Sequence, residues 1–104
     1  RAKFVSSVLA GADFAGADLT QADLTSADLR DVSFVRASLR GARLYDSNLR
    51  GANLTEAVLE GTDLLRANLS GATWTDGKTI CAEGSIGRCH PSNGAGASGS
   101  RVQG

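Results

Sequence analysis

The sequence is poor in the side chains that build most hydrophobic cores. Only 5% of its 104 residues are aromatic, and methionine is missing. An excess of charge of one sign is also lacking, because eleven Lys and Arg side chains balance eleven Asp and Glu side chains. A net charge of zero gives no overall attraction to nucleic acid or to an anionic membrane, so neither is expected as a partner. No run of 18 or more apolar residues occurs, so no transmembrane helix is expected. Arg1 is followed by no apolar stretch of the signal-peptide kind, and a first residue other than Met suggests a trimmed chain.

What the sequence does contain is a repeat with a period of five residues. Every fifth residue from Phe4 to Trp74 is Leu, Phe or Trp, fifteen times in succession. A small residue, most often Ala, lies two positions before each large one, and Asp or Asn is common between them. Gly often follows two positions after the large residue, as at Gly11 and Gly51. The repeat therefore predicts a structure that turns once every five residues.

Neither regular element accommodates this period. In an α-helix, residues five apart are rotated by about 140°, which would scatter the large side chains around the axis. In a β-strand, alternate members of the series would face water. A coil with flat sides and regular corners keeps every large residue inside. Gly suits such corners because it tolerates positive φ, and Asp and Asn favour turns.

The repeat resembles that of the pentapeptide-repeat family, whose motif reads A(D/N)LXX. The best matches are residues 17–21, 22–26 and 52–56, and the resemblance extends over residues 2–76. It implies an all-β fold, a right-handed quadrilateral parallel β-helix with four pentapeptides per coil. We therefore expect about four coils over residues 1–76.

Opposite charges recur at the spacing of 20 residues that such a coil requires. Within residues 1–76, six pairs of charged residues at this spacing have opposite sign and two have the same sign, whereas a spacing of 10 gives five of each. Coils of 20 residues also stack the large side chains in columns. One expected column of the core consists of Phe14, Phe34, Leu54 and Trp74, with Trp74 covering the open end of the stack.

The segment after Trp74 departs from the repeat and contains Cys81 and Cys89, the only cysteines. A local disulfide is the favoured interpretation, with two free thiols or a metal site shared with His90 as alternatives. A disulfide implies an oxidising compartment, such as the periplasm, the thylakoid lumen or the exterior; free thiols imply the cytoplasm. We expect a C-terminal capping loop over residues 77–92, followed by a flexible Gly- and Ser-rich tail over residues 93–104.

No group of residues has the pattern of a catalytic, cofactor or metal site. The Asp residues recur at one repeat position, which indicates a structural role at the corners, and the glycines follow the repeat rather than a phosphate-binding motif. No enzymatic activity and no cofactor are expected. Two surface features remain as candidate contacts. Arg30 and Arg50 fall in one column without an acidic neighbour there, and Tyr45 and Leu65 form an outward column.

These observations favour a structural or protein-interaction module with an unidentified protein partner. An alternative comes from the resemblance, because some long members of the family mimic DNA and bind DNA gyrase. The present sequence is shorter than those members and lacks their acidic surplus. The ends of a parallel coil expose unpaired backbone groups. The sequence offers no cover for the N-terminal end, so we also expect weak end-to-end self-association there.

Overall fold

The structure is a computed structural model that describes residues 3–91. Residues 1–2 and 92–104, which include the predicted tail over 93–104, lie outside the described part. Regular structure in residues 3–91 consists of turns and isolated β-bridges, without a helix or a longer strand. The described residues therefore contain no helix able to cross a membrane.

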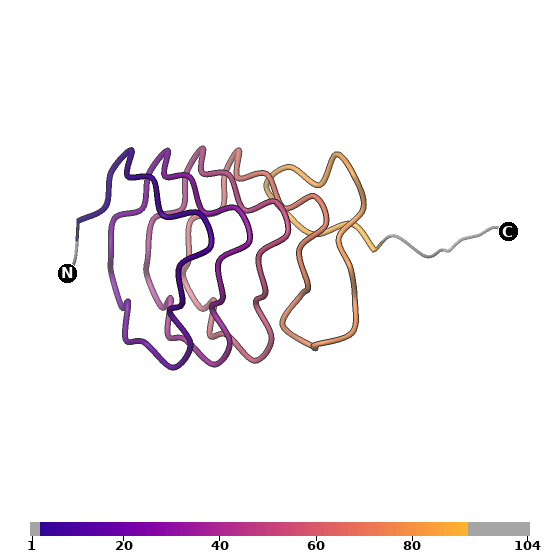
Figure 1. The fold of residues 1–104 in the computed structure, drawn as a ribbon, viewed down its shortest axis with the longest axis horizontal. Helices are drawn as coiled ribbons and strands as arrows, with labels where there is room; N and C mark the ends of the chain where they lie inside the picture. The colour runs from indigo at the N-terminus through magenta and orange to yellow at the C-terminus, as the bar shows by residue number, and fades with distance from the viewer. Residues whose placement is uncertain (1–2, 92–104) are drawn as a thin grey trace, which may run out of the picture.

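Parallel β-bridges join residues that are 20 positions apart. Eleven such bridges run from the pair Lys3 and Asp23 to the pair Asn53 and Thr73. Each bridge falls on the residue before a large one, so four pentapeptides complete one turn of the chain. Successive turns stack along the axis of a rod (Figure 1). The spacing of 20 residues predicted from the charges is thereby confirmed.

Each corner is a β-turn with one residue of positive φ. At the first corner the N–H of Ser7 donates to the C=O of Phe4 at 3.0 Å, and Ser6 has φ of 57°. The third residue of a type II turn needs positive φ, which favours Gly. Six corners over residues 3–76 meet that need with Gly, and eight place another residue in the same region. Those eight are Ser6, Gln21, Ser26, Asp31, Arg36, Asp46, Glu56 and Arg66.

The large and small residues of the repeat fill the interior of the rod. Phe34 and Leu54 of the predicted column are fully buried, whereas Phe14 and Trp74 at its two ends are partly buried. The rings of Phe14 and Phe34 stack with centroids 5.7 Å apart. Burial of one Leu side chain contributes about 1.5–3 kcal/mol. The interior is therefore a layered core of Leu and Phe separated by Ala.

The chain reverses after Asp76 and runs back over the last coil. Residues 77–91, called the cap below, pair antiparallel with that coil through the bridges Thr73–Ile80 and Asn68–Ile86. Cys81 donates its N–H to Ala72 and accepts from Gly71, so the cap pairs with the edge of residues 67–76 in the coil beneath it. Figure 1 shows the cap in orange and yellow at the C-terminal end of the rod.

Candidate functional site

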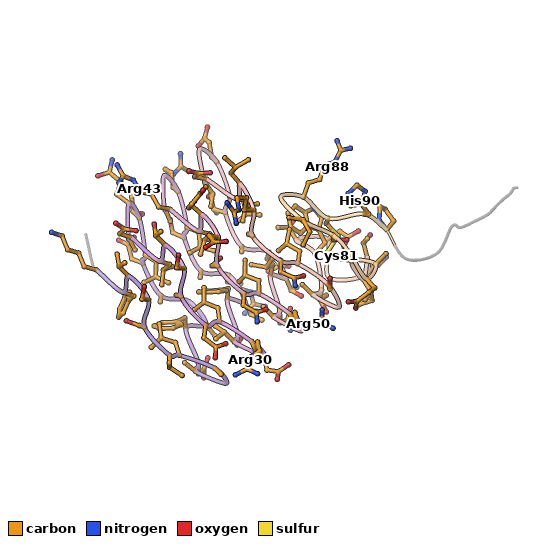
Figure 2. All side chains as sticks on the ribbon, turned by 90° about the horizontal axis from the view of Figure 1, so that it is seen from above. Arg30, Arg43, Arg50, Cys81, Arg88 and His90 are labelled. Carbon is orange, nitrogen blue, oxygen red and sulfur yellow. A yellow bond between two sulfur atoms is a disulfide. The ribbon has the colours of Figure 1, made fainter. Side chains whose placement is uncertain are left out.

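The first candidate contact, Arg30 and Arg50, differs from the expectation. The sequence column predicts two unpaired guanidinium groups, yet each binds a carboxylate. Arg30 donates from Nε and Nη2 to Asp28, at 2.8 and 2.7 Å. Arg50 donates from Nη1 and Nη2 to Glu83 of the cap, at 2.9 and 3.1 Å. The two arginines lie on the same side of the rod in Figure 2. The expectation that these two arginines lack an acidic neighbour is therefore wrong, because each forms an ion pair with a carboxylate.

The pKa values of these groups follow from the pairing. The hydrogen bond from Arg30 holds the pKa of Asp28 below its usual value, and the hydrogen bond from Arg50 does the same for Glu83. The pKa values of both arginines are raised in turn, first by these hydrogen bonds and then by the carboxylate charges. All four groups remain ionised at neutral pH, so the pairs persist there.

The second candidate contact, Tyr45 and Leu65, keeps an apolar group in solvent. The side chain of Leu65 is 63% exposed, and Tyr45 is half-buried in the same column. The guanidinium of Arg66 lies 5.9 Å from the centre of the Tyr45 ring, and its Nη2 is 3.6 Å from Asp46. The result is an apolar spot with a cation held over an aromatic ring.

Residues 57–66 form an edge to which the cap makes no backbone hydrogen bond. The cap pairs with residues 67–76, and beyond them it only approaches Leu64 and Arg66 at Gly87. The N–H groups of Leu59, Gly61, Leu64 and Arg66 have no backbone acceptor within residues 3–91. Exposed Val58 and Leu65 lie on this segment. We call residues 57–66 the open C-terminal edge. It lies beside the Tyr45 and Leu65 contact.

The aspartates of the repeat hold the corners. In Asp13, Asp18 and Asp63, Oδ1 accepts the N–H of the residue two positions on, at 3.0–3.1 Å. Asn48, Asn53 and Asn68 do the same. Hydrogen bonds from Thr20 and Thr25 lower the pKa values of Asp18 and Asp23. The carboxylates of Asp18 and Asp23 are ionised acceptors in turns, the opposite of a carboxyl group tuned to exchange protons near neutral pH.

The cap contains the cysteines and the single histidine. Cys81 and Cys89 form a disulfide, and Cys81 is buried. His90 is exposed and donates its backbone N–H to Oγ of Ser85 at 3.0 Å, while Ala82 donates to the C=O of His90. No group of three or more His, Cys, Asp or Glu side chains in residues 3–91 is arranged to hold a metal ion.

Some surface residues of the structure have no counterpart in the sequence interpretation. Val8 and Val58 occupy the repeat position that usually carries Asp, Asn or Ser, and both are exposed. This break in the pattern is visible in the sequence. The role of Glu83 is not, because it lies outside the repeat and 33 positions from Arg50.

Comparison with known proteins agrees with the geometry. The pentapeptide repeats family matches residues 2–41 and 37–73 in eight copies. The chain belongs to this family. A comparison with curated protein sequences gave no significant match.

Three solved structures of pentapeptide repeat proteins resemble the chain. One, from the Arabidopsis thaliana thylakoid lumen, is 37% identical over 73% of this chain and 50% of its own, with a TM-score of 0.65. HetL, involved in heterocyst differentiation regulation in the cyanobacterium Nostoc sp. strain PCC 7120, is 32% identical over 75% of this chain and 43% of its own, with a TM-score of 0.59. Rfr23 from the cyanobacterium Cyanothece 51142 is 33% identical over 69% of this chain and 53% of its own, with a TM-score of 0.55. The chain spans about half the length of these structures.

Proposed function

We propose that residues 3–76 form a right-handed quadrilateral β-helix of about four coils that acts as a non-enzymatic protein-binding module. The observation that carries this proposal is the exposed Leu65 beside Tyr45, next to the open C-terminal edge. A monomer surface usually scatters its apolar residues. Here an apolar spot, an aromatic ring with its cation and unpaired backbone donors adjoin one another.

The chemistry of this surface favours a partner that supplies an extended segment. The N–H groups of Leu59 and Gly61 stand where the following coil would accept them, as Leu39 and Gly41 donate to Val58 and Glu60. An extended peptide that adds to such an edge gains backbone hydrogen bonds, and its side chains meet the exposed apolar residues. Tyr and Arg are frequent among the residues that contribute most to protein interfaces.

The test is a comparison of protein partners captured by matched variants. Extracts of the native host are passed over the immobilised chain, over Leu65→Asp and over Ala15→Asp, an equal change at an exposed residue on another wall. We expect a partner that is retained by the chain and by Ala15→Asp but lost with Leu65→Asp. Equal capture by all three proteins would contradict the binding surface.

We further propose that the protein acts in an oxidising compartment. The disulfide between Cys81 and Cys89 supports this location, because reducing compartments keep thiols free. The resemblance to a thylakoid-lumen protein is compatible with it. Alkylation of intact protein from its native source tests the proposal. Two thiols that react without reductant would place the protein in a reducing compartment instead.

A further inference from the structure

The N-terminal end of the rod presents an ordered row of unpaired backbone groups. In later coils, the residue before each large one directs both its N–H and its C=O to the preceding coil. Asp28, for example, donates to Ser7 and accepts from Leu9, both at 2.8 Å. The corresponding residues of the first coil are Lys3, Val8, Asp13 and Asp18, called the N-terminal edge below. Their backbone groups have no backbone partner within residues 3–91.

The same end is apolar. Val8 is 79% exposed, and the large core residues of the first coil are less well covered than those of the second. Phe4 and Phe14 meet edge to face there, with ring centroids 6.0 Å apart. An edge with both free hydrogen-bonding groups and an apolar centre favours association with another strand-forming surface.

We propose that two copies of this chain pair at their N-terminal edges around a twofold axis, with Lys3 opposite the partner's Asp18 and Val8 opposite the partner's Asp13. A twofold axis perpendicular to the rod reverses the direction of the partner's coil, so every contact between the two edges is antiparallel. Residues that direct both N–H and C=O across an antiparallel pair form its hydrogen-bonded positions. Each of the four edge residues meets this requirement.

The shape of the coil selects this pairing. One coil climbs by one strand spacing, about 4.8 Å, over its 20 residues, so each end is a ramp. Two such ramps stay equally far apart around the whole coil when the lowest edge residue, Lys3, meets the highest, Asp18. With the axis through Val8 instead, the two Asp18 residues would face each other one full strand spacing too far apart.

Charge selects the same pairing. It sets two Lys3 ammonium groups against two Asp18 carboxylates and brings no like charges together. An axis through Lys3 would place the two lysines opposite each other and Asp13 against Asp13. Opposite charges stabilise a cross-strand pair, and like charges destabilise it.

Packing inside the joined coils is also complementary. In this register, large inward residues face small ones: Phe4 meets the partner's Ala17, and Leu9 meets the partner's Ala12. The cap at the other end already shows that these repeats accept an antiparallel strand, through the bridges Thr73–Ile80 and Asn68–Ile86. A rod 24 by 22 Å across limits the total buried area to roughly 1,000 Å², which is typical of a weak dimer.

A second copy is a better occupant than an endless stack. Head-to-tail stacking needs a free C-terminal end, and the cap covers half of that end with antiparallel strands. The twofold arrangement uses the N-terminal edge of both copies and closes on itself. The surface around Tyr45 and Leu65 takes no part in it, so this inference stands apart from the proposed function.

Sedimentation velocity of the 104-residue chain, from about 10 µM to about 1 mM, tests the association. We expect a monomer–dimer equilibrium that weakens as salt screens the Lys3 and Asp18 pairs. Lys3→Asp is expected to raise the dissociation constant at least tenfold, and Lys3→Asp with Asp18→Lys to restore it. Arg43 shows that this repeat position tolerates a base. Leu65→Asp, at the opposite end, is the control and should leave the dimer unchanged. A strict monomer at every concentration, or no response to Lys3→Asp, would overturn the proposal.

Cross-linking tests the register independently of affinity. A chain carrying both Val8→Cys and Asp13→Cys is expected to form disulfide-linked dimers under mild oxidation, because residues 8 and 13 lie opposite each other in the pair. Val8→Cys alone is expected to remain uncross-linked. Dimers from Val8→Cys alone would place the axis through Val8 and refute the pairing.

Discussion

The carboxylate of Glu83 in the cap accepts hydrogen bonds from both terminal nitrogens of Arg50 in the coil wall, at 2.9 and 3.1 Å. This pair joins the cap to the repeat and gives an acidic partner to one of the two arginines that have none in their column of the repeat. Asp28 is the acidic partner of the other, Arg30. Two separate contacts therefore pair both arginines of this wall with carboxylates.

Removing these two carboxylates should expose an anion-binding wall. The variant Asp28→Asn with Glu83→Gln keeps hydrogen-bond acceptors in place and frees both guanidinium groups. We expect it to elute from immobilised heparin at higher salt than the unmodified chain, because clustered positive charge attracts polyanions. The variant Glu56→Gln with Glu60→Gln changes net charge equally on other contacts and is the control. Equal elution of the two variants would contradict the anion-binding wall, because it would show that net charge alone, and not the position of the freed arginines, determines binding to heparin.

Overfilling the core should destabilise the fold. Ala37 is fully buried between layers of large residues. We expect Ala37→Leu to lower the free energy of unfolding by about 1–3 kcal/mol, because the added atoms force neighbouring side chains out of place. Urea denaturation measures the change, with Ala15→Leu at an exposed position as the control. Unchanged stability of Ala37→Leu would contradict the inward position of this residue.

The corners should respond to substitution through the backbone alone. Gly11 has φ of 77° and empty space where a Cβ would stand. We expect Gly11→Ala to cost about 1 kcal/mol, since positive φ strains a residue with a Cβ. Ser6→Gly, at a corner with φ of 57°, is the matched reverse change and should not destabilise the fold. The two effects are compared by urea denaturation, and equal losses would refute a backbone origin.

Reduction of the disulfide should loosen the cap before the coils. The bond closes a loop with a sequence separation of eight, and a short loop of this kind contributes about 2–3 kcal/mol in the chain-entropy account. With reductant, we expect faster hydrogen exchange at Gly71 and Cys81, whose N–H groups donate between coil and cap. The amides of Leu24 and Leu44 should exchange as slowly as before. Uniform acceleration along the chain would show that the cap does not open separately.

Acid should weaken the turn that begins the cap. Hydrogen bonds from the Thr79 hydroxyl and from the N–H groups of Thr79 and Lys78 lower the pKa of Asp76 from 3.8 to about 2. A lowered pKa means that the ionised carboxylate stabilises the fold above about pH 4, and that this contribution is lost as pH falls towards 2. Thermal melts of the chain and of Asp76→Ala should therefore differ at pH 5 and converge near pH 2. A difference that stays constant over this range would contradict the pKa.

The interior of the rod could be predicted from the sequence because the inward residue is set within each pentapeptide. The large residue of each pentapeptide, such as Leu24 or Leu44, must face inward for the chain to turn in step. The 20-residue spacing follows from charges on stacked walls. Arg36 with Glu56 and Arg66 with Asp46 form ion pairs at this spacing, as does Arg40 with Glu60.

The surface was harder to predict because its contacts do not follow the repeat. Arg30 pairs with Asp28 two positions away on its own wall, and a comparison limited to stacked neighbours misses that pair. Arg50 depends on the direction of the cap, which reverses the chain and returns Glu83 to the wall. No periodic signal describes that reversal. The corners also admit Ser, Asp and Arg where the pattern pointed to Gly.

The reversal after Asp76 also sets a rule for changing the length of the rod. Adding 20 residues before Arg50 would lengthen the molecule by one layer and leave Glu83 beside Arg50. Adding only five residues between Arg50 and the cap would rotate the cap by a quarter turn relative to Arg50 and separate that pair. Growth by whole turns is thus the change that this architecture tolerates best.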